Sequence, residues 1–243
     1  LTVTREKDAW GESFCYCANG VNFFAMGADY IPEDNLLGRV TPETTKKLLE
    51  KAIFANFNTI RVWGGGYYPS DWFYDLCDEK GILIWHDMMF ANADIPEQIP
   101  EFVNNVRKET EYQVTRLRNH PSLAYWCGSN EKTGIYGDLL VYGDFLIHEI
   151  IRGIVARRDP DRTYIGNSPY SWLDVGNNIH SGDSHHNSFE RALNNDITKY
   201  RNYVAEDIPV FVSEAAILGP NSVETLSKIF PKDKLWPINE YWE

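Results

Sequence analysis

The chain has 243 residues, of which 43% are hydrophobic and 14% are aromatic. This composition can fill a large core within one domain and excludes an intrinsically disordered protein. The formal charge is −12, from 23 Lys and Arg against 35 Asp and Glu, and it argues against a nucleic-acid partner because nucleic-acid-binding proteins concentrate positive charge.

Membrane, disulfide and metal-binding classes are also not expected. No run of residues is long and apolar enough to cross a bilayer, so we expect no membrane partner. The four cysteines do not form a disulfide framework in a chain of this length, and neither CxxC nor His-x-His spacing is present to support a zinc site. We therefore expect no metal and no cofactor, while the oligomeric state stays open.

Strand-like and helix-like segments alternate along the chain. Asn19-Gly20 predicts a hairpin turn within an entry hairpin, and Phe23–Ala28 predicts the first buried strand. A helix begins at Thr41, a capping residue followed by Pro42. The later segments are predicted, in chain order, as a strand at Thr59–Trp63, a helix at Trp72–Lys80, a strand at Ile82–Trp85, a helix at Glu97–Asn119, a strand at Leu123–Cys127, a helix at Asp138–Arg158, short strands at Tyr164–Gly166 and Asn178–His180, a helix at Phe189–Tyr203, a strand at Pro209–Ser213 and a helix at Val223–Phe230.

This alternation predicts an α/β fold with a parallel sheet and right-handed crossovers. Seven strand–helix units are one short of a (β/α)8 TIM barrel, so we expect residues 1–243 to form one barrel domain, with an entry hairpin over 1–20, that is incomplete at its C-terminal end. The alternative is a doubly wound open sheet. That fold is expected to carry GxGxxG after its first strand, whereas here Gly64-Gly65-Gly66 follows the second strand in a different pattern.

Two glutamates follow buried strands at positions suited to chemistry. Glu131 comes after the fourth predicted strand and Glu214 after the seventh, and the carboxyl ends of barrel strands are where such folds gather their catalytic residues. A pair of carboxylates, one protonated and one ionised, is the minimum machinery for glycoside hydrolysis. The alternative for either residue is a solvated side chain or one paired with an arginine. We expect Arg61, on the second strand, to keep one carboxylate ionised.

Two long motifs strengthen this interpretation. The first, RNHPSLAYWCGSNE, covers residues 118–131, and the second, IRVWGGGYYPSDWFYDLCDEKGILIWHDMMFA, covers residues 60–91. The first resembles the acid/base signature of glycoside hydrolase family 2, and the second resembles the β-mannosidase branch of that family. The resemblance extends over most of the chain, from the Asn19-Gly20 hairpin to the segment LWPINEYWE near the end.

The resemblance implies a retaining exo-β-glycosidase that acts on a neutral β-pyranoside, with a β-mannoside as the best single substrate. It implies Glu131 as the general acid/base and Glu214 as the nucleophile. Asn130 would bind the 2-hydroxyl of the sugar, Trp63 would form part of the wall of the sugar subsite, and Arg61 would orient Glu214. The alternative for Trp63 is a core tryptophan at a strand end.

The remaining site residues lie at the ends of the third and sixth strands. Asp87, after His86, is expected at the mouth of the third strand. His185 and His186 lie in Gly182–Asn187, where the family usually has Gly-Asp-x-His-Tyr-Trp, so that His186 replaces an aromatic hydroxyl. In addition, residues 213–216 read Ser-Glu-Ala-Ala in place of Ser-Glu-aromatic-Gly.

These departures concern the choice of sugar. The alternatives are another family activity, β-glucosaminidase or β-galactosidase, or a sugar-binding barrel without catalysis. Family members also carry β-sandwich domains ahead of the barrel, so this chain is expected to be a fragment with little activity of its own.

Overall fold

The computed structural model describes residues 1–132, 142–172, 176–186, 188–206, 208–215 and 221–242. It opens with a three-stranded antiparallel sheet of β1 (Thr2–Thr4), β2 (Cys15–Ala18) and β3 (Val21–Phe23). Asn19 and Gly20 connect β2 to β3, and both have positive φ angles, 52° and 79°. An Asn-Gly pair tolerates this left-handed backbone, which is why the hairpin turns there.

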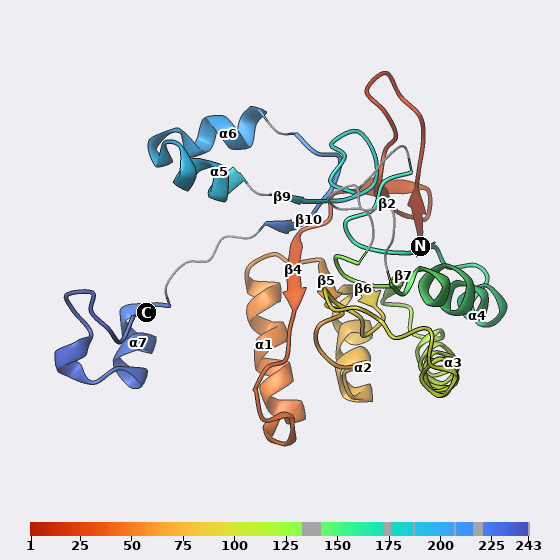
Figure 1. The fold of residues 1–243 in the computed structure, drawn as a ribbon, viewed down its shortest axis with the longest axis horizontal. Helices are drawn as coiled ribbons and strands as arrows, with labels where there is room; N and C mark the ends of the chain where they lie inside the picture. The colour runs from red at the N-terminus through yellow and green to blue at the C-terminus, as the bar shows by residue number, and fades with distance from the viewer. Residues whose placement is uncertain (133–141, 173–175, 187, 207, 216–220, 243) are drawn as a thin grey trace.

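A five-stranded parallel sheet forms the centre of the molecule (Figure 1). Its strands pair in strict chain order, and β5 and β7 are buried along their whole length. The strands are β4 (Gly27–Tyr30), β5 (Thr59–Val62), β6 (Leu83–Asp87), β7 (Leu123–Cys127) and β8 (Tyr164–Ile165). The expected α/β fold with a parallel sheet is therefore confirmed.

Two further parallel strands, β9 (Ser184–His186) and β10 (Val212–Ala215), pair with each other, and His185 lies opposite Glu214. The strand predicted at Asn178–His180 is wrong, because Ile179 and His180 form a turn and the strand of this region is β9, further along the chain. The sequence Ser-His-His has no apolar pattern that would predict a strand. It forms one through backbone pairing with the neighbouring β10. The strand predicted at Phe23–Ala28 is also wrong in its bounds. Phe23 ends β3, β4 begins only at Gly27, and the residues between them are not part of a strand.

Helices follow the central strands and lie along one side of the sheet, with α1 to α4 in chain order in Figure 1. Part of the helix predicted from Asp138 lies outside the described residues. So do Asn187 and Ala216, the last residues of the two segments that depart from the family pattern. The helices are α1 (Pro42–Phe54), α2 (Asp71–Lys80), α3 (Pro100–Leu117), the π-helix η2 (Leu146–Ile151) continuing into α4 (Arg152–Arg158), α5 (Ser188–Asn194), α6 (Tyr200–Glu206) and α7 (Val223–Ile229), with short 3-10 turns at η1 (Leu37–Arg39), η3 (Ile197–Lys199) and η4 (Lys232–Lys234).

Local sequence explains where the first two helices begin and end. The Thr41 hydroxyl accepts a hydrogen bond from the Thr44 N–H, and the Thr44 side chain accepts one from the Thr41 N–H, which is a capping box ahead of Pro42. At the end of α2, Gly81 has φ 70°, a left-handed conformation that stops the helix. The start of α1 and the end of α2 thus have partners for some of their otherwise unpaired backbone groups.

Side chains of the central strands alternate between two hydrophobic layers. Ile84 and Trp126 face the cluster between the sheet and the helices. Trp85, Tyr125 and Cys127 face a second cluster on the opposite side, which also contains Phe14 and Tyr16 from the N-terminal segment. The polar residues at the ends of β5, β6 and β7 lie above this second cluster, and they form the candidate site.

Candidate active site

Arg61 joins the ends of four separate segments. This β5 side chain is 4% exposed, and its Nη1 donates to Glu214 Oε1 at 2.8 Å. Its Nη2 donates to Asp87 Oδ2 at 2.8 Å and to Asn130 Oδ1 at 2.7 Å. A planar guanidinium can serve several acceptors in fixed directions, so Arg61 sets the relative positions of the three groups around it.

Asp87 lies at the end of β6 and is fully buried. Its oxygens accept hydrogen bonds from Arg61, from the Gly64 N–H at 3.0 Å and from Trp85 Nε1 at 2.8 Å. Asp87 therefore fixes the position of the Arg61 guanidinium through these hydrogen bonds. The neighbouring His86 projects to the other face of the strand, where its Nε2 lies 2.8 Å from the Tyr74 hydroxyl of α2, away from the site.

Glu131 lies four residues beyond β7, on a backbone with φ 51°. Its Oε1 lies 2.7 Å from His185 Nδ1, and its Oε2 accepts from Asn92 Nδ2 at 2.6 Å. The hydrogen bond with His185 lowers the pKa of Glu131 below its usual value; burial acts in the opposite direction, and Asn92 lowers the pKa further. The carboxylate remains one-third exposed, so a ligand can reach it.

Glu214 lies on β10 and faces Glu131. Its Oε1 accepts from Arg61, and its Oε2 lies 3.5 Å from His185 Nδ1. One carboxylate oxygen of each glutamate and one His185 nitrogen lie within 4.8 Å of one another. Retaining glycosidases place the two carboxyl groups about 5–5.5 Å apart and inverting enzymes about 6.5–9.5 Å, so this close approach is nearer to the retaining spacing than to the inverting one.

His185 lies between the two glutamates and is 8% exposed. Its Nε2 lies 3.0 Å from Ser168 Oγ, which donates to Asp183 Oδ2 at 2.6 Å. The Ser213 hydroxyl donates to the same Asp183 oxygen. Burial raises the pKa of Asp183, while the hydrogen bonds from the two serines oppose this shift.

Trp63 and His186 are the two predicted sugar-contacting residues with the least direct connection to the carboxylates. Trp63 follows β5 and is half-buried; its ring lies so close to Gly65 that a Cβ atom there would come within 2.0 Å of it. His186 ends β9 opposite Ala215, and side-chain alternation directs it to the other face of the strand from His185.

Sequence reasoning missed Asn92, Ser168, Asp183 and Asp29. Asn92 and Ser168 follow β6 and β8, and a polar residue just beyond a predicted strand was the signal that could have found them. Asp29, on β4, lies 3.9 Å from Arg61 Nη1, and within the described chain its buried Oδ1 has no hydrogen-bond partner. Burial raises the pKa of Asp29 to about 7, although Arg61 opposes this shift.

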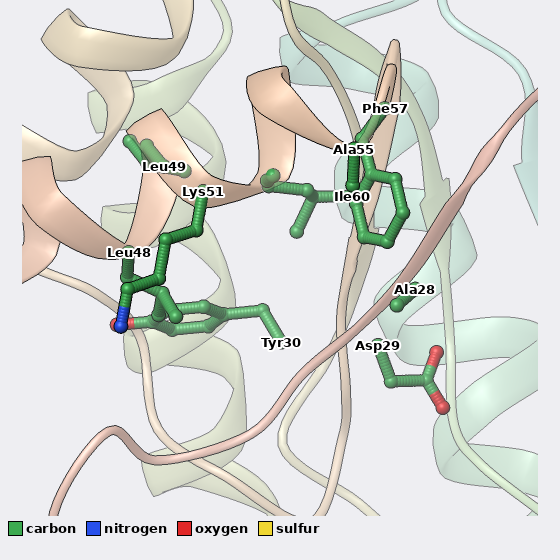
Figure 2. Close-up of a pocket in the computed structure, with 10 residues that line it drawn as sticks. Ala28, Asp29, Tyr30, Leu48, Leu49, Lys51, Ala55, Phe57 and Ile60 are labelled. Atoms are coloured by element: carbon green, nitrogen blue, oxygen red, sulfur yellow. The ribbon is translucent and has the colours of Figure 1, made fainter.

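An apolar pocket of about 300 Å³ lies between β4 and α1 (Figure 2). Leu48, Leu49, Phe57 and Ile60 line it, and neither glutamate does. Binding sites usually combine an apolar pocket with convergent polar groups. The polar groups of this protein converge at Arg61 and the two glutamates, so we place the candidate site there.

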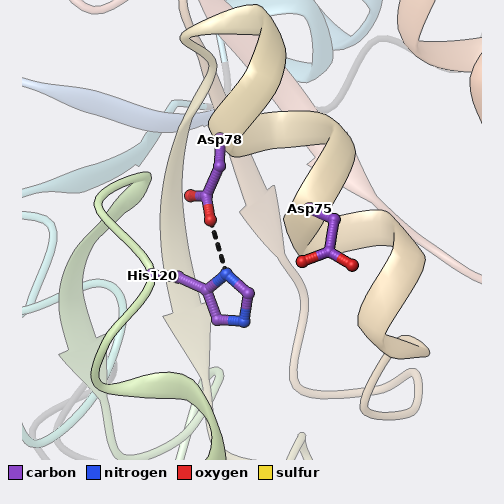
Figure 3. A group of neighbouring side chains, drawn as sticks. All are labelled: Asp75, Asp78 and His120. Carbon is purple, nitrogen blue, oxygen red and sulfur yellow. Dashed lines mark hydrogen bonds and ion pairs between the residues drawn. The ribbon is translucent and has the colours of Figure 1, made fainter.

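A second group of polar side chains joins Asp75 and Asp78 of α2 to His120 (Figure 3). Asp78 Oδ2 lies 2.6 Å from His120 Nδ1, and Asp78 Oδ1 accepts from the Ser122 N–H at 2.9 Å. Burial would raise the pKa of Asp78, but the hydrogen bonds from Ser122 and His120 lower it overall. This arrangement ties α2 to the turn that precedes β7.

Carboxylates and histidines are also the side chains that bind metal ions, and both groups combine these side chains. Ligands of a tetrahedral zinc ion at about 2.0–2.1 Å lie roughly 3.3 Å from each other. The His185–Glu131 contact at 2.7 Å and the His120–Asp78 contact at 2.6 Å are shorter. In this structure the paired atoms therefore lie at hydrogen-bond distance from each other.

Among the described residues, no helix is long and apolar enough to span a membrane. No family model matches the chain. A β-mannosidase from Rattus norvegicus is 44% identical over 171 residues, which cover 65% of this chain and 19% of that protein. A β-mannosidase from Mus musculus is 41% identical over 175 residues, which cover 67% of this chain and 20% of that protein. The chain thus spans about a fifth of the length of the curated relatives it matches.

A solved structure agrees with the sequence matches. The crystal structure of a β-D-mannosidase from Dictyoglomus thermophilum superimposes with a TM-score of 0.86 and 37% sequence identity. The match covers 96% of this chain and 29% of that one, so nearly all of the present fold is found in the larger protein. In both sequence and fold the chain is therefore β-mannosidase-like, which confirms the resemblance to glycoside hydrolase family 2.

Proposed function

We propose that this chain carries the catalytic carboxylates of a retaining exo-β-glycosidase that hydrolyses a neutral β-pyranoside, with a β-mannoside as substrate. The observation that carries the proposal is the placement of Glu131 and Glu214 within 4.8 Å at the ends of different parallel strands. The relatives named β-mannosidase support the choice of sugar. A carbohydrate is then the partner, and a nucleic acid is not.

The reaction would proceed by double displacement. Glu214 attacks the anomeric carbon as Glu131 gives a proton to the leaving oxygen, and the pair of electrons of the broken glycosidic bond stays with that oxygen. Glu131, now ionised, then takes a proton from water, which attacks the glycosyl ester and releases Glu214. Both steps need one carboxylate close to each face of the same carbon, and the short separation of the two groups supports this.

Arg61 and Asn130 would prepare the nucleophile and the sugar. The charge of Arg61, 2.8 Å from Glu214, favours the ionised carboxylate that attacks. A guanidinium can only donate hydrogen bonds, so Arg61 must bond the amide oxygen of Asn130. The amide nitrogen of Asn130 therefore points toward Asn92. From there Asn130 would donate to the 2-hydroxyl of the sugar, an interaction that strengthens in the transition state.

We also propose that the parallel strands belong to a (β/α)8 barrel, within one catalytic domain over residues 1–243. Strand order supports this: β4 to β8 pair in unbroken chain order, whereas doubly wound sheets reverse direction at a switch point. The nearness of β10 to β4 also supports it, because the seventh parallel strand returns toward the first, as a closing barrel requires.

Trapping the glycosyl-enzyme tests the function directly. A 2-deoxy-2-fluoro-β-mannosyl fluoride should label the full-length protein stoichiometrically, since the 2-fluoro group slows both steps while the fluoride leaving group keeps the first step fast enough for the intermediate to accumulate. Peptide mass analysis should find the label on Glu214. The Glu224→Gln variant, which changes an exposed glutamate of α7, should be labelled equally, and Glu214→Gln should not. A label on another residue would refute the assignment of the nucleophile, and absence of any label from active protein would refute the retaining mechanism.

A further inference from the structure

The environment of Glu131 leaves the source of the catalytic proton unexplained. A general acid must carry a proton when the substrate arrives. Yet His185 and Asn92 both direct polar nitrogens at the Glu131 oxygens, at 2.7 and 2.6 Å, and together they favour the ionised carboxylate over the protonated one. The pKa of Glu131 is accordingly lowered, with the His185 hydrogen bond as the largest cause. The proton must therefore be held nearby.

The hydrogen bonds around His185 indicate where this proton is held. Ser168 has one hydroxyl proton, and it donates this proton to Asp183 Oδ2 at 2.6 Å. With that proton directed at Asp183, Ser168 Oγ offers a lone pair to His185 Nε2, 3.0 Å away, and to Ser213 Oγ at 3.3 Å, so this geometry favours a proton on Nε2. A neutral ring would turn the bare lone pair of Nδ1 toward Glu131 Oε1 at 2.7 Å, where two lone pairs repel. This contact requires a second proton between Nδ1 and Oε1.

We propose that Glu131 and His185 share the proton that the reaction consumes, held on His185 as an imidazolium in the free enzyme. This inference rests on the proposed function and deepens it. When substrate binds, the Nδ1–H bond breaks, its electron pair stays on nitrogen, and an O–H bond forms at Oε1 of Glu131. That proton passes to the glycosidic oxygen. In the second half, the proton taken from water by Glu131 returns to Nδ1, so the cycle leaves no net change.

The charges around the imidazole favour this arrangement. Glu131 and Glu214 face Nδ1 at 2.7 and 3.5 Å, and Asp183 lies beyond Ser168 on the Nε2 side. Asp29 on β4 also acts on this cluster, and Arg61 on β5 is the opposing cation. With Asp87, which pairs with Arg61, five carboxyl groups thus surround one arginine and one histidine, so a cationic ring reduces the local excess of negative charge.

Leaving-group dependence separates this role from a structural one. A dinitrophenyl leaving group departs without protonation, whereas a phenyl leaving group needs an acid. His185→Gln keeps an N–H donor for Glu131 but cannot hold an exchangeable extra proton. In the full-length protein we expect this variant to lose about 100-fold or more in kcat/KM on phenyl β-mannoside and less than about 3-fold on 2,4-dinitrophenyl β-mannoside. The matched control His180→Gln, at an exposed turn, should match the wild type on both substrates.

Equal losses on the two substrates, or no loss on either, would overturn the proposal. An independent reading comes from ¹⁵N NMR of histidine-labelled wild-type protein, which should show both ring nitrogens of His185 protonated at neutral pH; a single protonated nitrogen would also overturn it. The NMR measurement does not depend on turnover or on the variant folding. If the wild type hydrolyses neither mannoside, the proposed function fails, and the NMR result still decides where the proton lies.

Discussion

At the scale of single residues, Arg61 determines the geometry of the site. Its guanidinium is almost completely buried and donates to Glu214, Asp87 and Asn130. A buried ion pair contributes little net stability when both partners are present, because each charge has lost its hydration. Removing one partner is far more costly, since the other charge is left buried without compensation. Asp87, with no exposed surface, is the partner at risk.

We therefore predict a strong coupling between Arg61 and Asp87. Arg61→Met should lower the free energy of unfolding by about 3–5 kcal/mol. Adding Asp87→Asn to this variant should recover part of the loss, with a coupling energy of about 1–3 kcal/mol in the double-mutant cycle measured by urea denaturation. The control is Arg39→Met, which breaks an exposed pair with Asp34 and should cost no more than about 1 kcal/mol. Additive effects at Arg61 and Asp87 would contradict this account.

At the scale of elements, the turn before β7 positions the loop beyond it, which carries Asn130 and Glu131. Asp78 of α2 bonds both the His120 ring and the Ser122 backbone, so it anchors the start of β7 (Figure 3). This explains the histidine of the RNHPS motif physically, because its ring bonds the carboxylate; Ser122 contributes its backbone N–H. Because β7 is a rigid, buried strand, an anchor at its start also limits the movement of Asn130 and Glu131 beyond its other end.

Asp78→Ala tests this anchor. The change leaves the Ser122 N–H and the His120 ring without their acceptor, so we expect the free energy of unfolding to fall by about 1–3 kcal/mol. Asp75→Ala is a matched control, because Asp75 lies one turn earlier on the same helix and is exposed; it should change stability by less than about 0.5 kcal/mol. Thermal or urea unfolding of the two variants measures the difference. Similar losses in both would show that Asp78 acts only as a surface charge.

At the scale of the whole molecule, the layer between sheet and helices contains a buried histidine that the site does not use. His86 has no exposed surface and stacks with Tyr68 and Tyr74. Burial lowers the pKa of His86 to about 3. The ring is thus neutral in the folded protein, whereas the unfolded chain takes up a proton near pH 6.5. Because the unfolded state binds more protons between these values, stability falls as the pH falls through this range.

His86 should therefore contribute to acid unfolding of the entire domain. Between pH 7 and pH 5, a histidine with these two pKa values lowers the free energy of unfolding by about 2 kcal/mol. His86→Gln removes this contribution, so urea midpoints of the variant should change less between pH 7 and pH 5 than those of the wild type. His180→Gln, at an exposed position, should keep the wild-type pH dependence. An unchanged pH dependence in His86→Gln would show that the ring is already accessible to protons when folded.

The elements with a strong local pattern were predictable. Thr41 and Pro42 marked the start of α1, Gly81 the end of α2, and the apolar run before Gly128 the buried strand β7. The resemblance of the 118–131 motif to glycoside hydrolase family 2, and of the 60–91 motif to its β-mannosidase branch, was also accessible from residues alone. These features depend on neighbours in sequence, through capping, left-handed backbone and burial on both faces of a parallel strand.

The position of β9 and the proton arrangement required tertiary structure. Ser184–His186 has no strand pattern, and it becomes a strand only because β10 provides backbone partners beside it. Similarly, sequence alone placed two glutamates after two strands and named His185 near them, but the roles of these residues stay predictions. Only the fold brings Ser168, Asp183 and Asn92 against that group, because hydrogen-bond direction depends on distances between segments that are far apart in the chain.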